Sequence, residues 1–244
     1  MSAGTFRCGT SGFQYDHWKG PFYPQDLARE EWFDFYGGRF GTVEINNTFY
    51  GLPSEATFRS WRDQAPEGFR YALKFSRYGS HLKHLKDGEQ TVPAFLEKAR
   101  LLEDRLGPIL VQLPPRWNPN PERLATFLEA APEKYRWAVE LREASWLRGD
   151  VLDILRDHGA ALCIHDLLED HPRELTTGWT YLRYHGPGPE KYAGSYQDAV
   201  LQGEAGWITA RLREGHDVYA YFNNDAQGNA PRNASQLAGM VSAE

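Results

Sequence analysis

Short apolar runs alternate with longer amphipathic stretches along this chain. Eight runs are rich in β-branched, aromatic and aliphatic side chains, which predicts strands. They cover Phe6–Thr10, Thr42–Asn46, Arg70–Phe75, Ile109–Leu113, Arg136–Leu141, Ala160–His165, Thr180–His185 and Asp217–Phe222. Their starts lie about 20 to 40 residues apart, which is the size of one strand followed by one helix.

Apolar positions at helical spacing fill most intervals between these strands. Helices are predicted over Leu27–Tyr36, after Ser54, from Pro93 to a stop at Gly107-Pro108, from Asn120-Pro121 to Pro132, over Val151–Arg156, around Trp207–Leu212 and over Ala234–Val241. The interval Asp166–Trp179 is too polar for an amphipathic helix. We therefore predict an α/β fold, a (β/α)8 barrel of the TIM type, in a single domain over residues 1–244. Its unit between strands six and seven is expected to be degenerate.

A doubly wound open sheet is the competing architecture. Its nucleotide-binding members carry a glycine-rich turn after the first strand, and neither G-x-G-x-x-G nor G-x-x-x-x-G-K-[ST] follows Thr10. Strands of such a sheet are apolar on both faces because helices cover both. Several strands predicted here have one polar face, which favours the barrel.

The polar face is clearest in the second predicted strand. Successive side chains of a strand point to opposite faces, so Glu44 and Asn46 share a face that Val43 and Ile45 do not. A buried carboxylate or amide costs free energy unless it is paired or used. The same alternation gives the other strands polar faces. These carry Lys74 and Ser76 on strand three, Gln112 on strand four, Glu140 and Arg142 on strand five, Arg183 and His185 on strand seven, and Tyr219, Tyr221 and Asn223 on strand eight. On strand six the polar face carries either Cys163 and His165 or Ile164 and Asp166.

If the apolar faces pack on the helices, the polar faces point into the barrel, where active sites lie at the carboxyl ends of the strands. The candidates for catalysis, as acid–base groups, proton carriers or metal ligands, are Glu44, Glu140 and His185. The candidates for neutralising an anion are Lys74, Arg142 and Arg183. The pocket walls and other substrate contacts are expected from Trp18, Tyr50, Trp146, Asn46, Gln112 and Asn223.

A purely structural network is the alternative for these charged side chains. Glu44, Lys74, Glu140 and Arg183 could neutralise one another and fill the barrel. Buried ion pairs add little stability compared with apolar packing. Buried charges also tend to mark functional sites, so we favour the functional reading.

The segments that follow the strands indicate the kind of ligand. Basic and aromatic residues concentrate there, although 27 Lys and Arg against 33 Asp and Glu give the chain a net charge of −6. The turn at His185-Gly186-Pro187-Gly188 and the Asn223-Asn224 pair occupy the position of the common phosphate site of barrels. We expect an anionic small molecule, a sugar phosphate or nucleotide, and a hydrolase or isomerase. A non-catalytic barrel that binds nucleic acid or a partner protein is the second hypothesis.

Metal binding is a further alternative. A divalent ion could be held by Glu44, Glu140, His165, Asp166 and His185, or by the H-x-x-H of His81 and His84, but no diagnostic metal motif is present. A solvated basic loop is the preferred reading of the two loop histidines. The sequence does not indicate an oligomeric state.

Composition fits a soluble protein of the cytosol. The chain has 244 residues and is 41% hydrophobic, and no apolar run approaches the roughly 18 residues of a membrane span. The N-terminus lacks the apolar stretch of a signal peptide. Cys8 and Cys163 both fall in apolar strands, which predicts reduced core thiols.

Several spaced motifs carry a family resemblance. They are GTSGFQYDHWKGPFYP (9–24), TVEINNTFYGLP (42–53), YALKFSRYGSHLKHLKD (71–87), GPILVQLPPRW (107–117), VELREASW (139–146), YLRYHGP (181–187) and YAYFNND (219–225) with a later Asn233-Ala234. On these motifs the chain resembles the domain-of-unknown-function family DUF 72, the YecE-like proteins, over nearly its whole length. The resemblance implies a TIM-barrel-like fold but no particular reaction. One departure is Glu143, which stands where the family commonly has a histidine.

Overall fold

A computed structural model describes residues 3–188, 190 and 192–243. The chain forms two compact units. The first unit comprises Met1–Glu44, Pro66–Phe69 and Leu182–Glu244, and the second comprises Ile45–Ala65 and Arg70–Tyr181. The single domain expected from the sequence stays a prediction.

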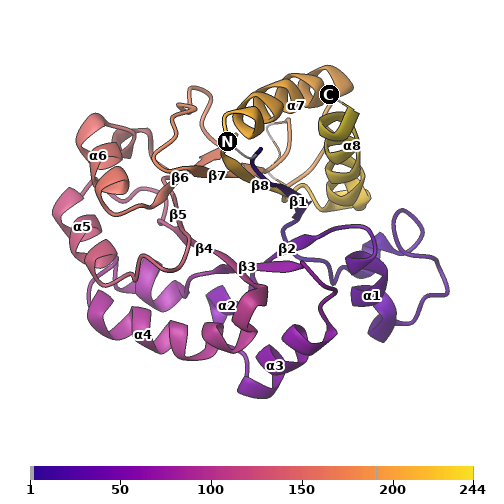
Figure 1. Ribbon diagram of the computed structural model, residues 1–244, viewed down its shortest axis with the longest axis horizontal. Helices are drawn as coiled ribbons and strands as arrows, with labels where there is room; N and C mark the ends of the chain where they lie inside the picture. Colours follow the sequence, from indigo (N-terminus) through magenta and orange to yellow (C-terminus); the bar gives the residue numbers. More distant parts are fainter. Residues whose placement is uncertain (1–2, 189, 191, 244) are drawn as a thin grey trace. The chain divides into compact units, whose positions relative to one another are not determined.

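Eight strands form one sheet with the order β1-β8-β7-β6-β5-β4-β3-β2 (Figure 1). Their bounds are β1 Phe6–Thr10, β2 Thr42–Ile45, β3 Arg70–Lys74, β4 Leu106–Gln112, β5 Trp137–Glu140, β6 Ala161–His165, β7 Trp179–Tyr184 and β8 Asp217–Phe222. The β1–β8, β3–β4, β4–β5 and β5–β6 ladders are all parallel. Parallel pairing in this order is the topology of a (β/α)8 barrel, which confirms the predicted fold class.

Helices follow most of the strands along the chain. Their bounds are α1 Trp32–Gly37, α2 Asn47–Tyr50, α3 Glu55–Gln64, α4 Gly88–Ala99, α5 Pro121–Glu129, α6 Gly149–Asp157, α7 Asp198–Arg213 and α8 Asn229–Ala243. Residues 166–178, all of which are described, contain no helix, so the degenerate unit between β6 and β7 is confirmed. Within the described part of the chain, no helix is both long and apolar enough to cross a membrane.

Two predicted helix starts are confirmed by their caps. The Ser54 hydroxyl accepts a hydrogen bond from Thr57 N (3.2 Å) at the start of α3. The Asn120 side chain accepts one from Arg123 N (3.0 Å) at the start of α5, where Pro121 occupies the first helical position. Each cap satisfies an N–H that the first helical turn leaves without a partner.

Two predictions around α4 are wrong. Pro93 does not open this helix, because Gln90 N and Thr91 N already donate to Asp87 O and start the helix at Gly88. Pro93 then lies inside α4, where its ring removes one backbone hydrogen bond. Gly107 and Pro108 do not end a helix but lie in β4. The β3–β4 register shifts opposite them, and at such an irregularity a residue without an N–H is tolerated.

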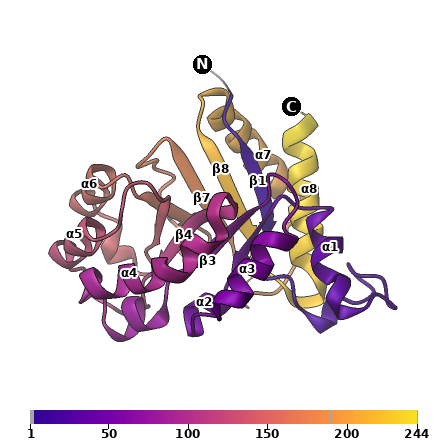
Figure 2. The ribbon, with the colours of Figure 1, turned by 60° about the horizontal axis from the view of Figure 1, so that its bottom comes forward.

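In the first unit, β1 and β8 pair from Phe6↔Val218 to Thr10↔Phe222. Helices α7 and α8 pack against each other, and both pack on β8 (Figure 2). Gly9 is required by the close approach of β1 to Thr42, because a Cβ at Gly9 would lie 2.2 Å from Thr42 O. The Tyr36 hydroxyl joins the same two segments: it accepts from Thr10 N (2.9 Å) and donates to Thr42 O (3.0 Å).

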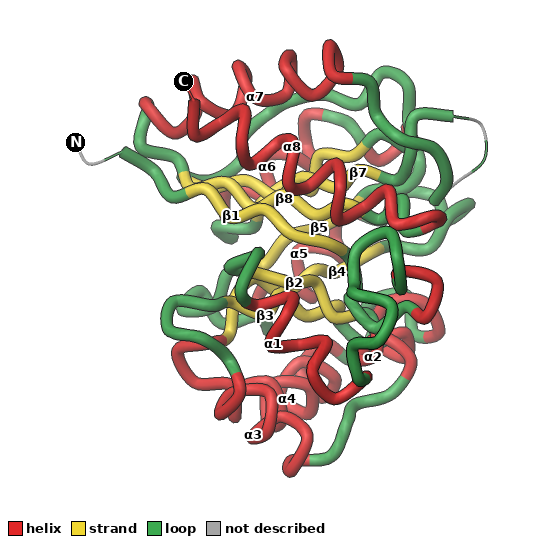
Figure 3. The backbone as a smooth tube through the Cα atoms, turned by 90° about the vertical axis from the view of Figure 1, so that its right-hand side faces the viewer, coloured by secondary structure: helices red, strands yellow, loops and turns green. Residues whose placement is uncertain are grey.

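In the second unit, α3 packs against α4 (Figure 3), and α4 packs against α5 and α5 against α6 (Figure 1). Aromatic side chains fill the space between these helices and the strands. The Phe75 ring lies 5.1 Å from that of Phe95 and 5.3 Å from that of Phe127, and Trp137 packs against both Phe75 and Phe127. This packing fixes the position of β3, which ends immediately before Phe75.

Candidate functional site

Buried polar side chains occupy the carboxyl ends of successive strands. Lys74, Gln112, Glu140 and His165 are the last residues of β3, β4, β5 and β6, and Glu44 and Arg183 are next to last in β2 and β7. Asp166 is exposed, so His165 is the polar side chain that β6 buries. The positions fall into two groups, one in each unit, and each group is described by itself.

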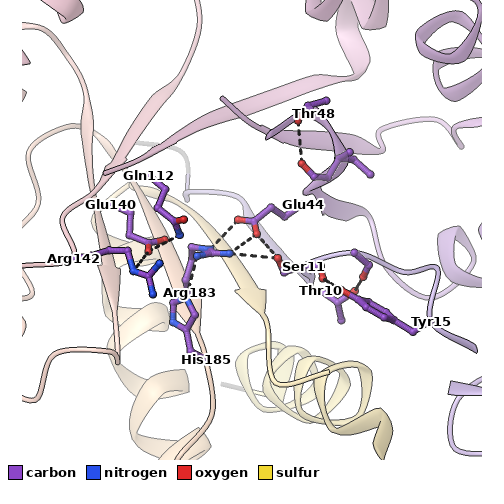
Figure 4. A network of polar contacts seen from close by, with 12 residues as sticks. Thr10, Ser11, Tyr15, Glu44, Thr48, Gln112, Glu140, Arg142, Arg183 and His185 are labelled. Atoms are coloured by element: carbon purple, nitrogen blue, oxygen red, sulfur yellow. Dashed lines mark hydrogen bonds and ion pairs between the residues drawn. The ribbon is translucent and has the colours of Figure 1, made fainter. Parts of the chain in front are cut away.

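The first unit holds the Glu44 cluster, which consists of Ser11, Glu44, Arg183 and His185 (Figure 4). The Arg183 guanidinium donates to both oxygens of Glu44, from Nε to Oε2 (3.0 Å) and from Nη2 to Oε1 (2.7 Å). The Ser11 hydroxyl also donates to Glu44 Oε1. Glu44 is fully buried and Arg183 is 1% exposed. Two opposite charges are therefore held together without solvent between them.

His185 is fixed by the same arginine. Arg183 Nη1 lies 2.9 Å from His185 Nε2. A guanidinium can only donate hydrogen bonds, so His185 Nε2 is the acceptor and the imidazole proton is on Nδ1. A doubly protonated His185 would place an N–H against the guanidinium. This contact therefore favours the neutral ring.

Tyrosine hydroxyls adjoin the Glu44 cluster in the first unit. Thr42 Oγ1 and the Tyr221 hydroxyl are 2.7 Å apart. Burial raises the pKa of Tyr221 well above its usual value, and burial likewise raises the pKa of Tyr36. Both hydroxyls stay neutral at physiological pH and act as hydrogen-bonding groups, not as bases.

The second unit holds the Glu140 cluster, which consists of Gln112, Glu140 and Arg142 (Figure 4). Gln112 Nε2 donates to Glu140 Oε1 (2.8 Å), and Arg142 Nε lies 3.6 Å from the same oxygen. Glu140 is fully buried, whereas the Arg142 side chain is 15% exposed. This distance from Arg142 Nε to Glu140 Oε1 exceeds that of a direct hydrogen bond, whereas Arg183 donates to both oxygens of Glu44 over 3.0 Å and 2.7 Å.

His165 supports the end of β5. Its Nε2 lies 2.9 Å from Leu141 O, and Leu167 N donates to its Nδ1 (3.2 Å). Since Nδ1 accepts a hydrogen bond, Nε2 carries the proton and donates to the carbonyl. Both ring nitrogens are therefore occupied by backbone groups, which fits a structural role for His165.

Basic side chains converge near the end of β3. We call Lys74, Arg77, His81, His84 and Arg142 the basic cluster. Lys74 Nζ lies over the Phe49 ring at 4.4 Å, and the His81 ring contacts the same ring at 4.9 Å. Burial is the largest of the effects that lower the pKa of His81 to about 4, and the positive charges of Lys74, Arg142, Arg77 and His84 account for the rest. The positive potential around His81 is what an anionic ligand would complement.

The remaining predicted residues have varied surroundings. Tyr50 is 79% exposed, and Asn46 and Asn223 are half-buried. Trp18 and Trp146 are buried, and each indole N–H donates to a backbone carbonyl, that of Asp225 (2.9 Å) and that of Trp117 (2.7 Å) respectively. These hydrogen bonds anchor loops, and the roles of both tryptophans as pocket walls stay predictions.

Sequence reasoning missed three residues of these groups. Ser11 follows β1 directly, and its position at a strand end could have identified it. Phe49, in α2, was not singled out, because its contact with Lys74 joins it to a strand 25 residues further along the chain. His81 was expected in a solvated loop, whereas it is half-buried and its Nδ1 lies 3.0 Å from the Ser80 hydroxyl.

No metal centre is evident in the described part of the chain. Among residues 3–188, 190 and 192–243, no three His, Cys, Asp or Glu side chains are grouped so that they could hold an ion. No step proposed below uses a metal ion.

Comparison with known proteins gives consistent matches. Over residues 7–244 the chain matches the model of the family described as protein of unknown function DUF72. It is 33% identical to the UPF0759 protein YecE of Escherichia coli over 108 residues, which span 44% of this chain and 40% of YecE. A crystal structure of a DUF72 family protein from Thermotoga maritima is 29% identical, with a TM-score of 0.86, and the match covers 98% of this chain and 99% of that one.

A more distant likeness concerns the fold alone. The structure of L-ribulose 3-epimerase is 13% identical, with a TM-score of 0.54, and the match covers 98% of this chain and 86% of that one. The identity is too low to transfer an activity. The family match extends over nearly the whole sequence, and the DUF72 family structure from Thermotoga maritima has a similar fold along the whole chain. This chain belongs to the DUF72 family.

Proposed function

We propose that this protein is an enzyme that binds a phosphate-containing small molecule at the carboxyl ends of β3–β5 and acts on it by acid–base chemistry of the hydrolase or isomerase class. The observation that carries the proposal is the basic cluster beside a buried carboxylate. Lys74 and Arg142 both raise the positive potential at His81, and Arg142 also lies 3.6 Å from Glu140. Cations that bind an anion next to a carboxylate that moves a proton are a recurring arrangement in such enzymes.

Each side chain then has a distinct part. Lys74 and Arg142 neutralise the phosphate through charge-assisted hydrogen bonds. Glu140 is the acid–base group, and Gln112 orients its carboxylate through the bond to Oε1. When a phosphate binds Arg142, the guanidinium turns further from Glu140, so ligand binding changes the basicity of that carboxylate.

The Glu44 cluster supports a different role within this proposal. Both oxygens of Glu44 accept from Arg183, so the carboxylate serves to position the guanidinium. Arg183 in turn sets the tautomer of His185. Catalysis by Glu44 and His185 stays a prediction, as does a cytosolic location.

Likeness of fold adds one piece of support. L-ribulose 3-epimerase has a similar fold, so this architecture accommodates isomerase chemistry on a sugar. At 13% identity the likeness lends nothing more specific. The substrate class proposed here therefore depends on the charges of the basic cluster.

Calorimetric titration with ribose 5-phosphate tests the proposal. Lys74→Met should weaken binding roughly tenfold or more, because it removes a charge-assisted contact to the phosphate. Lys134→Met, at an exposed position beside Tyr135, is the matched control and should bind as the wild type does. Glu140→Gln should retain binding and lose turnover of the phosphate ester. A wild type that binds neither ribose 5-phosphate nor inorganic phosphate would refute the proposal.

Binding of nucleic acid without catalysis is the second candidate. The exposed rings of Tyr50 and Tyr78, with Arg77 next in sequence to Tyr78, favour it. The salt dependence of binding separates the two candidates. A single-stranded oligonucleotide that neutralises several phosphates would lose affinity steeply with salt, whereas one phosphate ester would show a shallow slope.

A further inference from the structure

A groove of about 350 Å³ opens in the second unit. It lies between α2 with its following turn, the segment after β3, and helix α4. Four aromatic side chains line it: Phe49, Tyr50, Tyr78 and Phe95. The predicted site includes only Tyr50 among these, so the groove is a feature that strand-end reasoning did not reveal.

The aromatic walls are available to a ligand. Tyr50 is 79% exposed and Tyr78 is 54% exposed, which is unusual for large aromatic side chains. Exposed rings around a concave surface favour a flat partner, because ring faces bury more apolar area against a planar group than against a branched one.

The polar groups of the groove favour a neutral partner. The Asp87 carboxylate is already paired with Lys83 Nζ (3.0 Å), and the same ammonium lies 5.5 Å from the centroid of the Tyr78 ring. The charge at this end is therefore balanced within the chain. Gln90 also lines the groove, and its amide can both donate and accept. A flat group whose edge carries a donor and an acceptor, such as a nucleobase, matches these properties.

The groove is continuous with the basic cluster. Phe49 lines the groove and also contacts Lys74 (4.4 Å) and His81 (4.9 Å). Arg77, a member of the cluster, is exposed and lies between Ser76 and Tyr78, which both line the groove. A ligand with its flat part in the groove would therefore have cations near one end.

We propose that the groove holds the base of a nucleoside monophosphate whose phosphate is bound by the basic cluster. The phosphate half of this statement rests on the proposed function, whereas the base half rests on the groove alone. Among phosphate esters, the proposal selects nucleotides over simple sugar phosphates. It also gives Tyr50 and Tyr78 a role in specificity, because they contact the part of the ligand that distinguishes the two.

Paired titrations test the base half. Adenosine 5′-monophosphate and ribose 5-phosphate share the ribose and the phosphate, and the base takes the place of the anomeric hydroxyl in the nucleotide. The ratio of their dissociation constants therefore measures the contribution of the base to binding. Stacking on the groove should make the nucleotide bind roughly tenfold more tightly or better. Ala94→Phe places a ring in the groove from an exposed position of α4 and should bring the ratio of the two constants close to one. Thr126→Phe, exposed on α5 and outside the groove, should leave the ratio unchanged.

The outcomes of these titrations separate the groove from the proposed function. If the wild type binds both ligands equally, the inference is overturned while the proposed function stands. If the nucleotide binds, ribose 5-phosphate does not and Lys74→Met has no effect, the proposed function is overturned and the groove stands. If neither ligand binds, both are overturned. Tyr50→Ala removes an exposed ring and should lower the ratio as well, which keeps the test valid if Ala94→Phe does not fold.

Discussion

The Glu44–Arg183 pair allows a quantitative prediction about stability. Both side chains are buried, and the guanidinium makes two hydrogen bonds to the carboxylate, of 3.0 Å and 2.7 Å. Glu44→Gln leaves the charge of Arg183 buried without compensation. Arg183→Met leaves the charge of the Glu44 carboxylate buried without its counter-charge. The double variant removes both charges at once.

The magnitude follows from these contacts. A hydrogen bond to a charged group contributes about 1.5–3 kcal/mol, so the two bonds together represent about 3–6 kcal/mol. Breaking a buried ion pair by removing one partner costs about 3–5 kcal/mol, which agrees with that sum. We therefore expect each single variant to lose about 3–5 kcal/mol in the free energy of unfolding. The double variant should lose less than the two singles combined, with a coupling of about 2 kcal/mol or more.

Equilibrium unfolding in urea at pH 7 measures these values, with Glu140→Gln as the matched substitution at another buried strand end. The amide oxygen that this substitution introduces can still accept from Gln112, and Arg142 is 15% exposed and can turn toward water. We expect Glu140→Gln to cost only about 1–2 kcal/mol. If Glu44→Gln costs less than about 1 kcal/mol, or if the double variant is additive, then Glu44 is not the buried counter-charge of Arg183 and the reasoning fails.

Two further predictions concern the backbone and the basic cluster. Gly9→Ala should cost about 1–3 kcal/mol of unfolding free energy, because its Cβ would lie 2.2 Å from Thr42 O, whereas Gly203→Ala, in an open position of α7, should be neutral or stabilising. The lowered pKa of His81, about 4 against an ordinary 6.5, means that the unfolded chain binds a proton first as the pH falls. The contribution of His81 to the free energy of unfolding is therefore fully present above pH 6.5. It is lost progressively as the pH falls toward 4, because only the unfolded chain binds the proton in that range. A His81→Gln variant with the same pH profile as the wild type would contradict this, and NMR should show the pKa of His81 rising when sulfate binds.

Local chemistry made much of the fold predictable. The caps at Ser54 and Asn120 involve residues only three positions apart, so the sequence contains all the information that they need. The strands were predictable because their polar and apolar side chains alternate every two residues, which is also a local pattern. Pro93 and Gly107-Pro108 were misread because a helix started by Asp87 and a shift in the β3–β4 register decide their surroundings. Tertiary contacts of this kind override local preference.

The site was predictable only as a set of positions. Alternation identified Glu44, Glu140 and Arg183 as buried polar side chains, and all three are buried. Alternation could not show that Glu44 and Arg183 form an ion pair, because the two residues are 139 positions apart in sequence. It could not identify the contact between Lys74 and Phe49 either, because an aromatic residue outside the strands carries no periodic signal.

The contrast between the two glutamates is the strongest argument for where chemistry occurs. Both are fully buried at strand ends, so burial does not distinguish them. Glu44 accepts two bonds from one guanidinium, and protonating it would break a buried ion pair. A group held in this way is poorly suited to exchange a proton in each catalytic cycle. Glu140 accepts from a neutral amide, and the guanidinium of Arg142 lies 3.6 Å away on a partly exposed side chain that an anion could engage. Under the proposed function, an anion that engages Arg142 draws this guanidinium away from Glu140, and the carboxylate serves as the acid–base group.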